Sequence, residues 1–523
     1  MNKAKITILF TIFILGTFIS CNEMDTENTV KEQNTNISIQ KSSNLELKEV
    51  FAKALAKVLN ENREARELIK NEALKKIDYD YDVLYLMVKD TQFSNGVTFE
   101  ESLLEYIDYE ALSQIKQEIP TLTIFVPALP ENSFSAEIWN TDNEIPVVAI
   151  RTNEMAYIPV YDKTGTESKI LFSQIPGFPV IVIKENERIV ASKSSSSLRS
   201  SSGQNLELSF IDEVFDNTHP KLRAERDATR TGTSSITNGL PNNLYKIGTA
   251  YQVYEGTSGW QRDYIYYNIT PSNLKGPFHY NFKEHIVGFE MVGDANYALK
   301  KISDQSGDPA ILPSSSSSDR ASFWTDGEFE FKAKYYVGNK NGLENEHYTF
   351  FRVSPYNLFF ISTAKIISNG KTRYEVGRLD NMRVFLSVPL FSWNLEMYSG
   401  SLKISIEEVD SNETFENTTS GTGEFASNFE YNVSYGEQVK VGMKYGESQK
   451  ETRTVAYKST ISRVNDDLGE VIINFGDPVI TPPPVLRGTY PHLSESDLNS
   501  SYYTGWYRIY IAPVRTYGTD DSY

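Results

Sequence analysis

The sequence contains little cysteine and little histidine. One cysteine and five histidines occur in 523 residues. A single cysteine excludes an intramolecular disulfide, and it excludes a zinc or iron–sulfur site built on the cysteines of one chain. No histidine belongs to an HExxH motif, and the six-residue spacing of His279 and His285 suits neither a helix face nor a zinc hairpin. We therefore predict no metal site and assign all the histidines to solvent-facing or core positions: His219, His279, His285, His347 and His492.

Positive charge is also scarce. Lys and Arg total 51 against 69 Asp and Glu, which gives a formal net charge of −18. A protein that binds nucleic acid needs clustered Lys and Arg to contact the phosphates, so we predict no nucleic-acid partner. Hydrophobic residues make up 40% of the chain and aromatic residues 12%, enough to build packed cores. The length predicts two or three domains.

Motifs that mark catalytic sites are missing. The sequence has no Gly-x-Ser-x-Gly elbow and no phosphate-binding loop. Three carboxylates alternate in 78–82, as at the start of an EF-hand calcium loop, but Val83 and Lys89 occupy the positions that need Gly and Glu. We interpret 78–82 as an exposed turn or strand edge. The paired carboxylates of glycoside hydrolases have no local signature, so a secreted hydrolase stays open, with no catalytic residue assigned.

The apolar run at the N-terminus is too short to span a membrane. Lys3 and Lys5 precede the uncharged segment 6–20. As a helix at about 1.5 Å per residue, such a run spans about 22 Å, short of the roughly 30 Å hydrocarbon core. Acidic residues follow it instead of a basic stop-transfer cluster. These features predict a cleaved signal peptide at 1–20.

The single cysteine, Cys21, comes directly after this signal. The sequence Phe18-Ile19-Ser20-Cys21 resembles a bacterial lipobox, with Ser20 as the small residue before the cysteine and Phe18 in place of the usual Leu. The resemblance implies a diacylglyceryl thioether on Cys21, cleavage before this residue, and acylation of the new amino terminus by a chain such as palmitate. Several acyl chains anchor a protein stably where one is marginal. The alternative is an ordinary secretory signal with an incidental cysteine.

The residues that follow Cys21 indicate a destination. Asn22 stands where an Asp would mark retention in the inner membrane. The acidic Glu23, Asp25 and Glu27 resemble the surface-export signals of Bacteroidota lipoproteins. We predict a lipid-anchored protein of the outer membrane, displayed on the cell surface, with the periplasmic face as the alternative.

The first half of the mature chain is predicted to contain a tether and an α+β domain. Residues 21–42 are polar and predict a disordered tether. In the domain at 43–191, Ser43 and Glu46 fit a capping box, and apolar residues recur at helical spacing. We expect further helices from about Asn62 and over 99–117. Short β-branched runs then predict a small antiparallel sheet over 122–127, 146–151, 157–161 and 179–184.

The second half is predicted to consist almost entirely of β-strands. Residues 192–243 begin with a serine-rich stretch and predict a polar linker. Residues 244–523 predict a mainly antiparallel, sandwich-like region of one or two subdomains, because apolar and polar residues alternate in 329–335 and 402–406. A last strand pair is expected around 506–511.

Part of the first domain is similar to a group of secreted bacterial proteins that are classified only as a domain of unknown function. The similarity lies in FAKALAKVLNENREAREL (51–68), IFVPALP (124–130) and PGFPVIVI (176–183). It covers less than a third of the chain and implies no activity, cofactor or site residue.

Aromatic residues point to binding. The chain has 32 Tyr, and aromatic faces exposed on a β domain can stack on sugar rings or anchor a protein partner. The alternative is that they fill the core or strands, where aromatic residues are common. The residues concerned are Tyr264, Tyr266, Tyr267, Tyr502, Tyr503, Trp506 and Tyr507. We predict a surface protein that binds a glycan or a protein ligand without a cofactor.

A second function stays open because of segment 425–461. Apolar and polar residues alternate through most of it, as in a β-hairpin that inserts into a membrane. An ordinary hairpin with one face on a core has the same alternation. A pore-forming or antagonistic toxin is therefore the alternative to a binding protein.

Overall fold

The structure is a computed structural model. It describes residues 26–151, 157–193, 206–211, 215–218, 244–256, 259–303, 308–309, 323–339, 346–409, 416–427, 451–462, 466–481, 485–487, 490–492 and 495–516. The predicted signal peptide, Cys21 and most of the predicted linker lie outside these residues. The chain divides into two compact units, Met1–Glu46 and Leu47–Tyr523. No helix in the described part is both long and apolar enough to cross a membrane.

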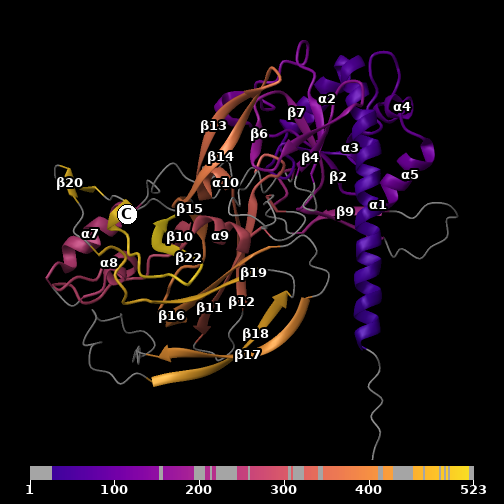
Figure 1. Ribbon diagram of the computed structural model, residues 1–523. Coiled ribbons are helices and arrows are strands. Elements are labelled where there is room, and N and C mark those ends of the chain that lie inside the picture. The colour runs from indigo at the N-terminus through magenta and orange to yellow at the C-terminus, as the bar shows by residue number, and fades with distance from the viewer. Residues whose placement is uncertain are drawn as a thin grey trace, which may run out of the picture. The chain divides into compact units, whose positions relative to one another are not determined.

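Two consecutive helices open the described chain: α1 (Thr26–Glu61) and α2 (Arg63–Ala73) (Figure 1). The prediction that Asn62 begins a helix is confirmed, because its side chain accepts a hydrogen bond of 3.2 Å from the Ala65 amide. The predicted helix start at Ser43 is wrong, because α1 begins at Thr26, within 21–42. The polar sequence before Ser43 has no apolar stripe that would have predicted this extension.

Three shorter helices follow: α3 (Tyr85–Val88), α4 (Phe99–Leu104) and α5 (Tyr109–Glu118). The sequence predicted one helix over 99–117, whereas the chain breaks it after Leu104. The amides of Tyr106 and Ile107 both donate to the Leu103 carbonyl and close a turn there. This turn buries Ile107, and α5 then starts in a new direction.

A six-stranded sheet forms the core of the N-terminal domain. Its strand order is β1 (Asp82–Leu84), β2 (Leu122–Phe125), β7 (Val180–Glu185), β3 (Val147–Ile150), β4 (Tyr157–Tyr161) and β5 (Glu167–Leu171). The predicted strands therefore form. The sheet is not wholly antiparallel as expected, because β3 pairs with β7 in parallel. Periodicity locates a strand but does not determine its partner.

One short strand connects the two halves of the chain. Strand β6 (Gln174–Pro176) pairs with β14 (Lys371–Asn381), which also pairs with β13 (Phe359–Ser368). The buried indole of Trp324 adds a 3.1 Å hydrogen bond to the Gln174 carbonyl. Residues before and after the predicted linker thus share one sheet.

The second half contains two further antiparallel sheets. In one, β10 (Phe282–Met291) lies between β15 (Val384–Pro389) and β22 (Tyr507–Arg515). The other has the order β12 (Glu346–Val353), β11 (Phe329–Asn339), β16 (Tyr398–Glu408) and β19 (Asp466–Asn474). The expected alternating apolar residues of β11 and β16 are buried. The predicted class, an α+β domain followed by a mainly antiparallel β region, is confirmed.

Helices also occur where only strands were expected. They are α7 (Tyr245–Tyr254), α8 (Gln261–Tyr267), α9 (Ala295–Lys301) and α10 (Pro355–Leu358). The tyrosines of α8 have strand propensity, but tertiary contacts outweigh it. Tyr266 stacks on Phe278 with ring centroids 5.6 Å apart, and its hydroxyl donates to Glu284 at 3.1 Å.

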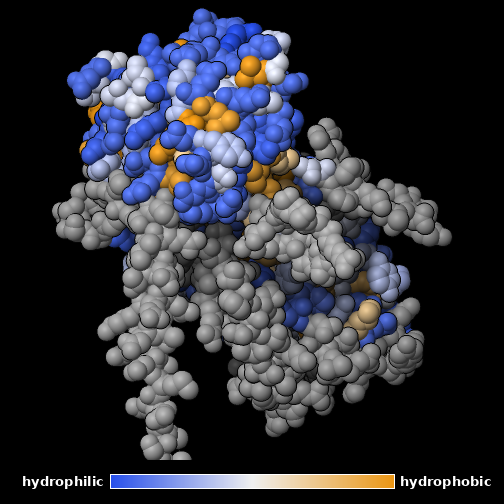
Figure 2. All heavy atoms as spheres, turned by 90° about the vertical axis from the view of Figure 1, so that its right-hand side faces the viewer, coloured by the Kyte–Doolittle hydropathy of each residue, from blue (hydrophilic) through white to orange (hydrophobic). Residues whose placement is uncertain are grey.

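The remaining elements are short or paired two by two. The pairs are β8 (Ile189–Lys193) with β9 (Leu206–Phe210), β17 (Glu416–Ser427) with β18 (Glu451–Ser462), and β20 (Val485–Arg487) with β21 (Tyr490–His492). Single 3-10 turns occur at Pro130–Asn132 and Glu495–Asp497. Where Figure 2 shows described residues, hydrophilic side chains predominate and hydrophobic ones form small separate patches.

Candidate functional site

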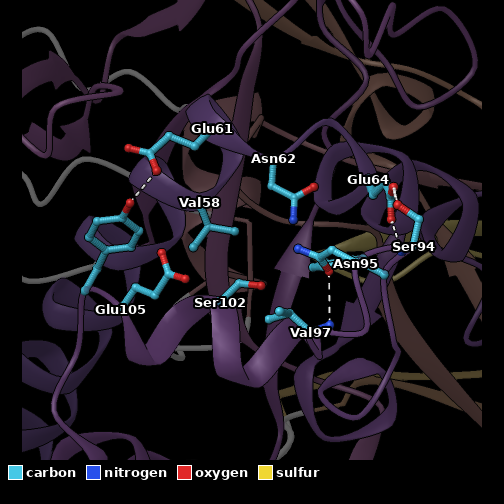
Figure 3. Close-up of a pocket in the computed structure, with 11 residues that line it drawn as sticks. Val58, Glu61, Asn62, Glu64, Ser94, Asn95, Val97, Ser102 and Glu105 are labelled. Carbon is cyan, nitrogen blue, oxygen red and sulfur yellow. Dashed lines mark hydrogen bonds between the residues drawn. The ribbon is translucent and has the colours of Figure 1, made fainter.

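A pocket of about 300 Å³ opens where the end of α1, the start of α2 and the end of α4 meet. Figure 3 shows side chains from all three helices turned toward it. The loop between α3 and α4 completes its wall. The lining residues are Val58, Glu61, Asn62, Glu64, Phe93, Ser94, Asn95, Val97, Ser102, Glu105 and Tyr106.

Local sequence determines the two helix starts that border the pocket. Asn62 adopts an extended backbone between α1 and α2 and caps α2, so the chain changes direction there. Thr98 begins α4 through a capping box with Glu101. The Glu101 carboxylate accepts a 2.7 Å hydrogen bond from the Thr98 amide, and Thr98 Oγ1 accepts one of 3.2 Å from the Glu101 amide. These caps satisfy backbone donors and fix where the helices begin.

The loop at 93–97 is a tight turn closed by its own backbone. The Phe93 amide donates to the Val97 carbonyl at 2.9 Å, and the Val97 amide donates to Asn95 Oδ1 at 3.0 Å. Gly96 has a φ of 82°, in the left-handed region that glycine adopts without strain. The turn holds Ser94 and Asn95 at the rim of the pocket (Figure 3).

Two carboxylates of the rim already accept hydrogen bonds within the protein. Glu64 accepts from the Ser94 amide at 2.6 Å and from the Ser94 hydroxyl, and these bonds lower the pKa of Glu64. The Tyr106 hydroxyl donates to Glu61, and this bond raises the pKa of Tyr106 to about 12. Figure 3 shows Glu61 and Glu64 on opposite sides of the space. Glu64 is thus held ionised as an acceptor, whereas a general acid needs a raised pKa.

The lining combines an apolar base with a polar, negatively charged rim. Val58, Phe93 and Val97 contribute the apolar groups, and three glutamates contribute negative charge. No Lys, Arg or His is among the lining residues. Amide and hydroxyl groups of Asn62, Asn95 and Ser102 add donors and acceptors, and such mixed lining is typical of sites for small polar ligands.

The histidines that the structure describes are dispersed. His285 lies in β10, and burial lowers its pKa to about 4, so it is neutral near pH 7. His347 stacks on Tyr335 with ring centroids 5.3 Å apart. His219 lies outside the described residues. Within the described residues, no group of three or more His, Cys, Asp or Glu side chains is arranged to hold a metal ion.

Residues 78–82 form a turn that leads into β1, the edge strand of the sheet, but they are not exposed as the sequence predicted. Their three aspartates are buried, and Asp82 begins β1. Burial of carboxylates requires compensating charges, and these come from residues distant in the sequence. We call the resulting set the buried ionic cluster; it comprises Asp78, Asp80, Asp82, Lys184, Glu187, Arg188, Glu328, Glu330 and Arg352.

Most of the tyrosines considered for ligand stacking fill the core. Tyr266, Tyr267, Tyr502 and Tyr507 are buried. Tyr503 is 61% exposed. The half-buried ring of Trp506 stacks on exposed Tyr297, with centroids 5.0 Å apart, and Tyr264 is also half-buried.

The alternating segment 425–461 is described only at its ends. Strands β17 and β18 pair there, with Phe425 opposite Arg453 and Gly423 opposite Val455. Residues 428–450, which carry most of the alternation, lie outside the described residues. Whether this segment enters a membrane stays a prediction.

None of the pocket residues was predicted to be functional, and Asn62 was predicted only as a helix start. The signals that could have located the pocket are the cap at Asn62 and the Thr98–Glu101 capping box, since both helix starts border it. The contact of α2 with the loop at 93–97, between Glu64 and Ser94, is tertiary and leaves no local pattern. No family model, no curated protein and no solved structure matches the chain, so its own geometry must carry the functional argument.

Proposed function

We propose that the protein is a lipid-anchored lipoprotein of the cell envelope and that it binds a polar ligand in the pocket between α1, α2 and α4. A glycan is the first candidate for this ligand, and a protein is the second. The observation that carries this proposal is the lining of the pocket. Carboxylate, amide and hydroxyl groups surround a space of about 300 Å³ above an apolar base. Sugars present hydroxyl groups for such acceptors and C–H faces for such a base.

The pocket favours a glycan over a folded protein partner because it is small and concave. A stable protein interface needs roughly 800 Å² on each partner, centred on aromatic or arginine anchors. The pocket offers neither a large apolar area nor a lining arginine. A single sugar residue at the end of a chain fits its scale, and the three glutamates favour a neutral or amino sugar over an acidic one.

Binding is tested with glycan arrays and calorimetry on the mature protein. Glu105 is exposed and lines the pocket, and Glu110 is exposed on α5 and does not line it. We expect Glu105→Gln to weaken binding about tenfold to a hundredfold, the usual effect of losing a hydrogen bond to a charged group. Glu110→Gln is the matched control and should bind as the wild type does. Equal loss in both variants, or no glycan bound at all, would contradict the proposal.

The anchor is tested separately. Mass spectrometry of the N-terminus should find an acylated Cys21 in the wild type and no acylation in Cys21→Ala. Protease accessibility on intact cells then distinguishes surface display from the periplasmic face. An unmodified chain that is cleaved elsewhere would end the lipoprotein part of the proposal, while the pocket experiment would be unaffected.

One observation supports the alternative of a pore-forming protein. Strands β17 and β18 each have 12 residues and pair in continuous antiparallel register. A membrane-spanning β-strand needs about 9–11 residues. A toxin of this type should release dye from liposomes in proportion to protein concentration, and the release should depend on 425–461. A binding protein predicts no release.

A further inference from the structure

The buried ionic cluster lies between the N-terminal sheet and the start of the second half. Asp78, Asp80 and Asp82 come from β1 and the segment before it, and Lys184, Glu187 and Arg188 from the end of β7 and the turn into β8. Glu330 is the second residue of β11, Glu328 directly precedes this strand, and Arg352 belongs to β12. Ion pairs inside the cluster therefore hold β11 and β12 against the N-terminal domain.

Arg188 is the central cation, and its side chain is fully buried. Its Nη2 lies 2.9 Å from Asp80 Oδ2 and 2.5 Å from Glu330 Oε1, and its Nε donates to the same Glu330 oxygen at 2.6 Å. Its Nη1 donates to the Asp78 carbonyl at 2.5 Å. One guanidinium thus binds carboxylates from both sides of the boundary.

Lys184 neutralises carboxylates on the N-terminal side alone. Its Nζ lies 3.1 Å from Asp82 Oδ2 and 2.7 Å from both carboxylate oxygens of Glu187. The Asn186 amide donates to Asp78 Oδ2 at 2.7 Å and to Asp82 Oδ2 at 3.2 Å. These contacts complete one half of the cluster without any group from β11 or β12.

On the other side, Arg352 binds Glu328, the residue directly before β11. Its Nη1 lies 3.1 Å from Glu328 Oε2, and its guanidinium carbon lies 3.9 Å from the centroid of the Tyr79 ring. In the β11–β12 ladder Arg352 is also the direct partner of Glu330. Arg352 therefore connects the hairpin to the 78–82 segment.

Carboxylates outnumber cations in this buried volume. Asp78, Asp80, Asp82, Glu187, Glu328 and Glu330 face Lys184, Arg188 and Arg352. An uncompensated carboxylate is very unfavourable away from water, so a buried group of this kind keeps its proton instead of ionising. Separation of the two sides would return the carboxylates to water, where they ionise at ordinary pKa values.

We propose that the buried ionic cluster is a pH-sensitive latch, which holds the β11–β12 hairpin against the N-terminal domain in acid and loosens as the pH rises. The carboxylate that links the two sides is Glu330. The charged groups around it are Asp80, Glu187 and Arg188 from the N-terminal domain, Glu328 just before its own strand, and Arg352 on β12. Directly after β16 its neighbour is the uncharged Val409, whose amide donates to the Glu330 carbonyl.

The directions of the pKa shifts give the sign of the effect. Burial raises the pKa of Glu330 to about 8, against the lowering effect of Arg188. Burial likewise raises the pKa of Asp78, Asp82 and Glu328. Asp80 is the exception in the cluster, because Arg188, Lys184 and Arg352 outweigh its burial and lower its pKa, so its contribution opposes that of the other four carboxylates. A carboxyl group whose pKa is higher in the closed state than in the open state stabilises the closed state. This stabilisation is complete below the open-state pKa and is lost as the pH rises through the closed-state pKa. For Glu330 the window runs from its ordinary pKa of 4.5 to about 8.

Hydrogen exchange measured by mass spectrometry on the full mature chain tests the latch. Protection factors, corrected for the intrinsic exchange rate, are compared from pH 5 to pH 9 for peptides covering 78–84 and 328–333. We expect protection to fall by about tenfold per pH unit for each proton released between pH 5 and pH 8, and to level off above that. Peptides from β4 and β5, at the end of the N-terminal sheet opposite to β1 and therefore remote from the cluster, should keep their protection.

Three variants make the test specific. Glu330→Gln keeps the shape of the protonated acid and should remove most of the pH dependence. Glu328→Gln should remove a smaller part of the pH dependence of protection. It is the variant to use if Glu330→Gln does not fold. Glu167→Gln, an exposed residue on β5, is the control and should follow the wild type.

Two results would overturn the latch. One is equal protection of 78–84 and 328–333 at pH 6 and pH 9 in the wild type. The other is an unchanged pH dependence in both glutamine variants, which would assign the effect to groups outside the cluster. Loss of protection in the remote peptides at the same pH would also count against it, because the whole unit would then be unfolding.

Discussion

Gly327 packs directly against the buried ionic cluster. A Cβ atom built on this glycine would lie 1.9 Å from Asp80 Oδ2 and 2.7 Å from its carboxyl carbon. Asp80 cannot move aside freely, because it is ion-paired to Arg188. The position therefore requires glycine for space.

Gly327→Ala should lower the free energy of unfolding by about 1–3 kcal/mol, the usual effect of forcing extra atoms into a packed interior. Urea unfolding followed by circular dichroism measures this difference. Gly505→Ala is the matched control, since a Cβ at Gly505 meets nothing within 4 Å. A Gly327→Ala protein as stable as the control would mean that Asp80 relaxes without cost.

The aspartates of 78–82 illustrate what the sequence could and could not reveal at this scale. Their alternation was visible, and its failure as a calcium loop was readable from Val83 and Lys89. Their burial was not, because the cations that permit it are about a hundred and more positions away and have no spacing relation to them. Tyr79, at a φ of 75°, also departs from the extended backbone that alternation suggests.

Helix α4 shows how a single cap can organise an element that borders the pocket. The motif of Ser or Thr followed three residues later by Glu occurs at Ser43 and at Thr98, and only Thr98 begins a helix. The difference is context: residues before Ser43 continue the helix, whereas those before Thr98 form the turn at 93–97. A local motif thus marks a possible helix start, and the preceding chain decides whether it is used.

Thr98→Ala should reduce the free energy of unfolding by about 1 kcal/mol, because the Glu101 amide loses its acceptor. The same change should weaken ligand binding slightly, since α4 carries Ser102 and Glu105 is its C-cap. Chemical denaturation and calorimetry measure the two effects. Thr98→Ser keeps the capping oxygen and should behave as the wild type. An equal loss in Thr98→Ser would point to the methyl group instead of the cap.

Over the whole molecule, the order and class of many elements were predictable, but helices α7, α8, α9 and α10 were missed and the partners of the strands were not predictable. Runs of β-branched residues predicted β2, β3, β4 and β7, and alternation predicted β11 and β16. Pairing of β3 with β7, and of β6 with β14, depends on chain segments brought together from far apart. The sequence also predicted a boundary at 192–243, yet ion pairs and a shared sheet connect the residues on its two sides.

These connections imply that the N-terminal domain does not keep its stability alone. A chain ended after residue 243 would lack Glu330 and Arg352, so Arg188 would lose one of its carboxylate partners and β6 its strand partner. Removing a buried hydrogen-bond partner of a charged group costs about 1–3 kcal/mol or more, a substantial part of the 5–15 kcal/mol that stabilises a typical domain. Thermal unfolding of the truncated chain should therefore be broad, or shifted to a temperature well below that of the full mature protein.

A chain that starts at residue 44 is the control, because it keeps the compact unit Leu47–Tyr523, and it should unfold at the same temperature as the full protein. A truncated chain that unfolds as sharply and at the same temperature as the full protein would show that the shared sheet and the cluster add little, and that the N-terminal domain is independent.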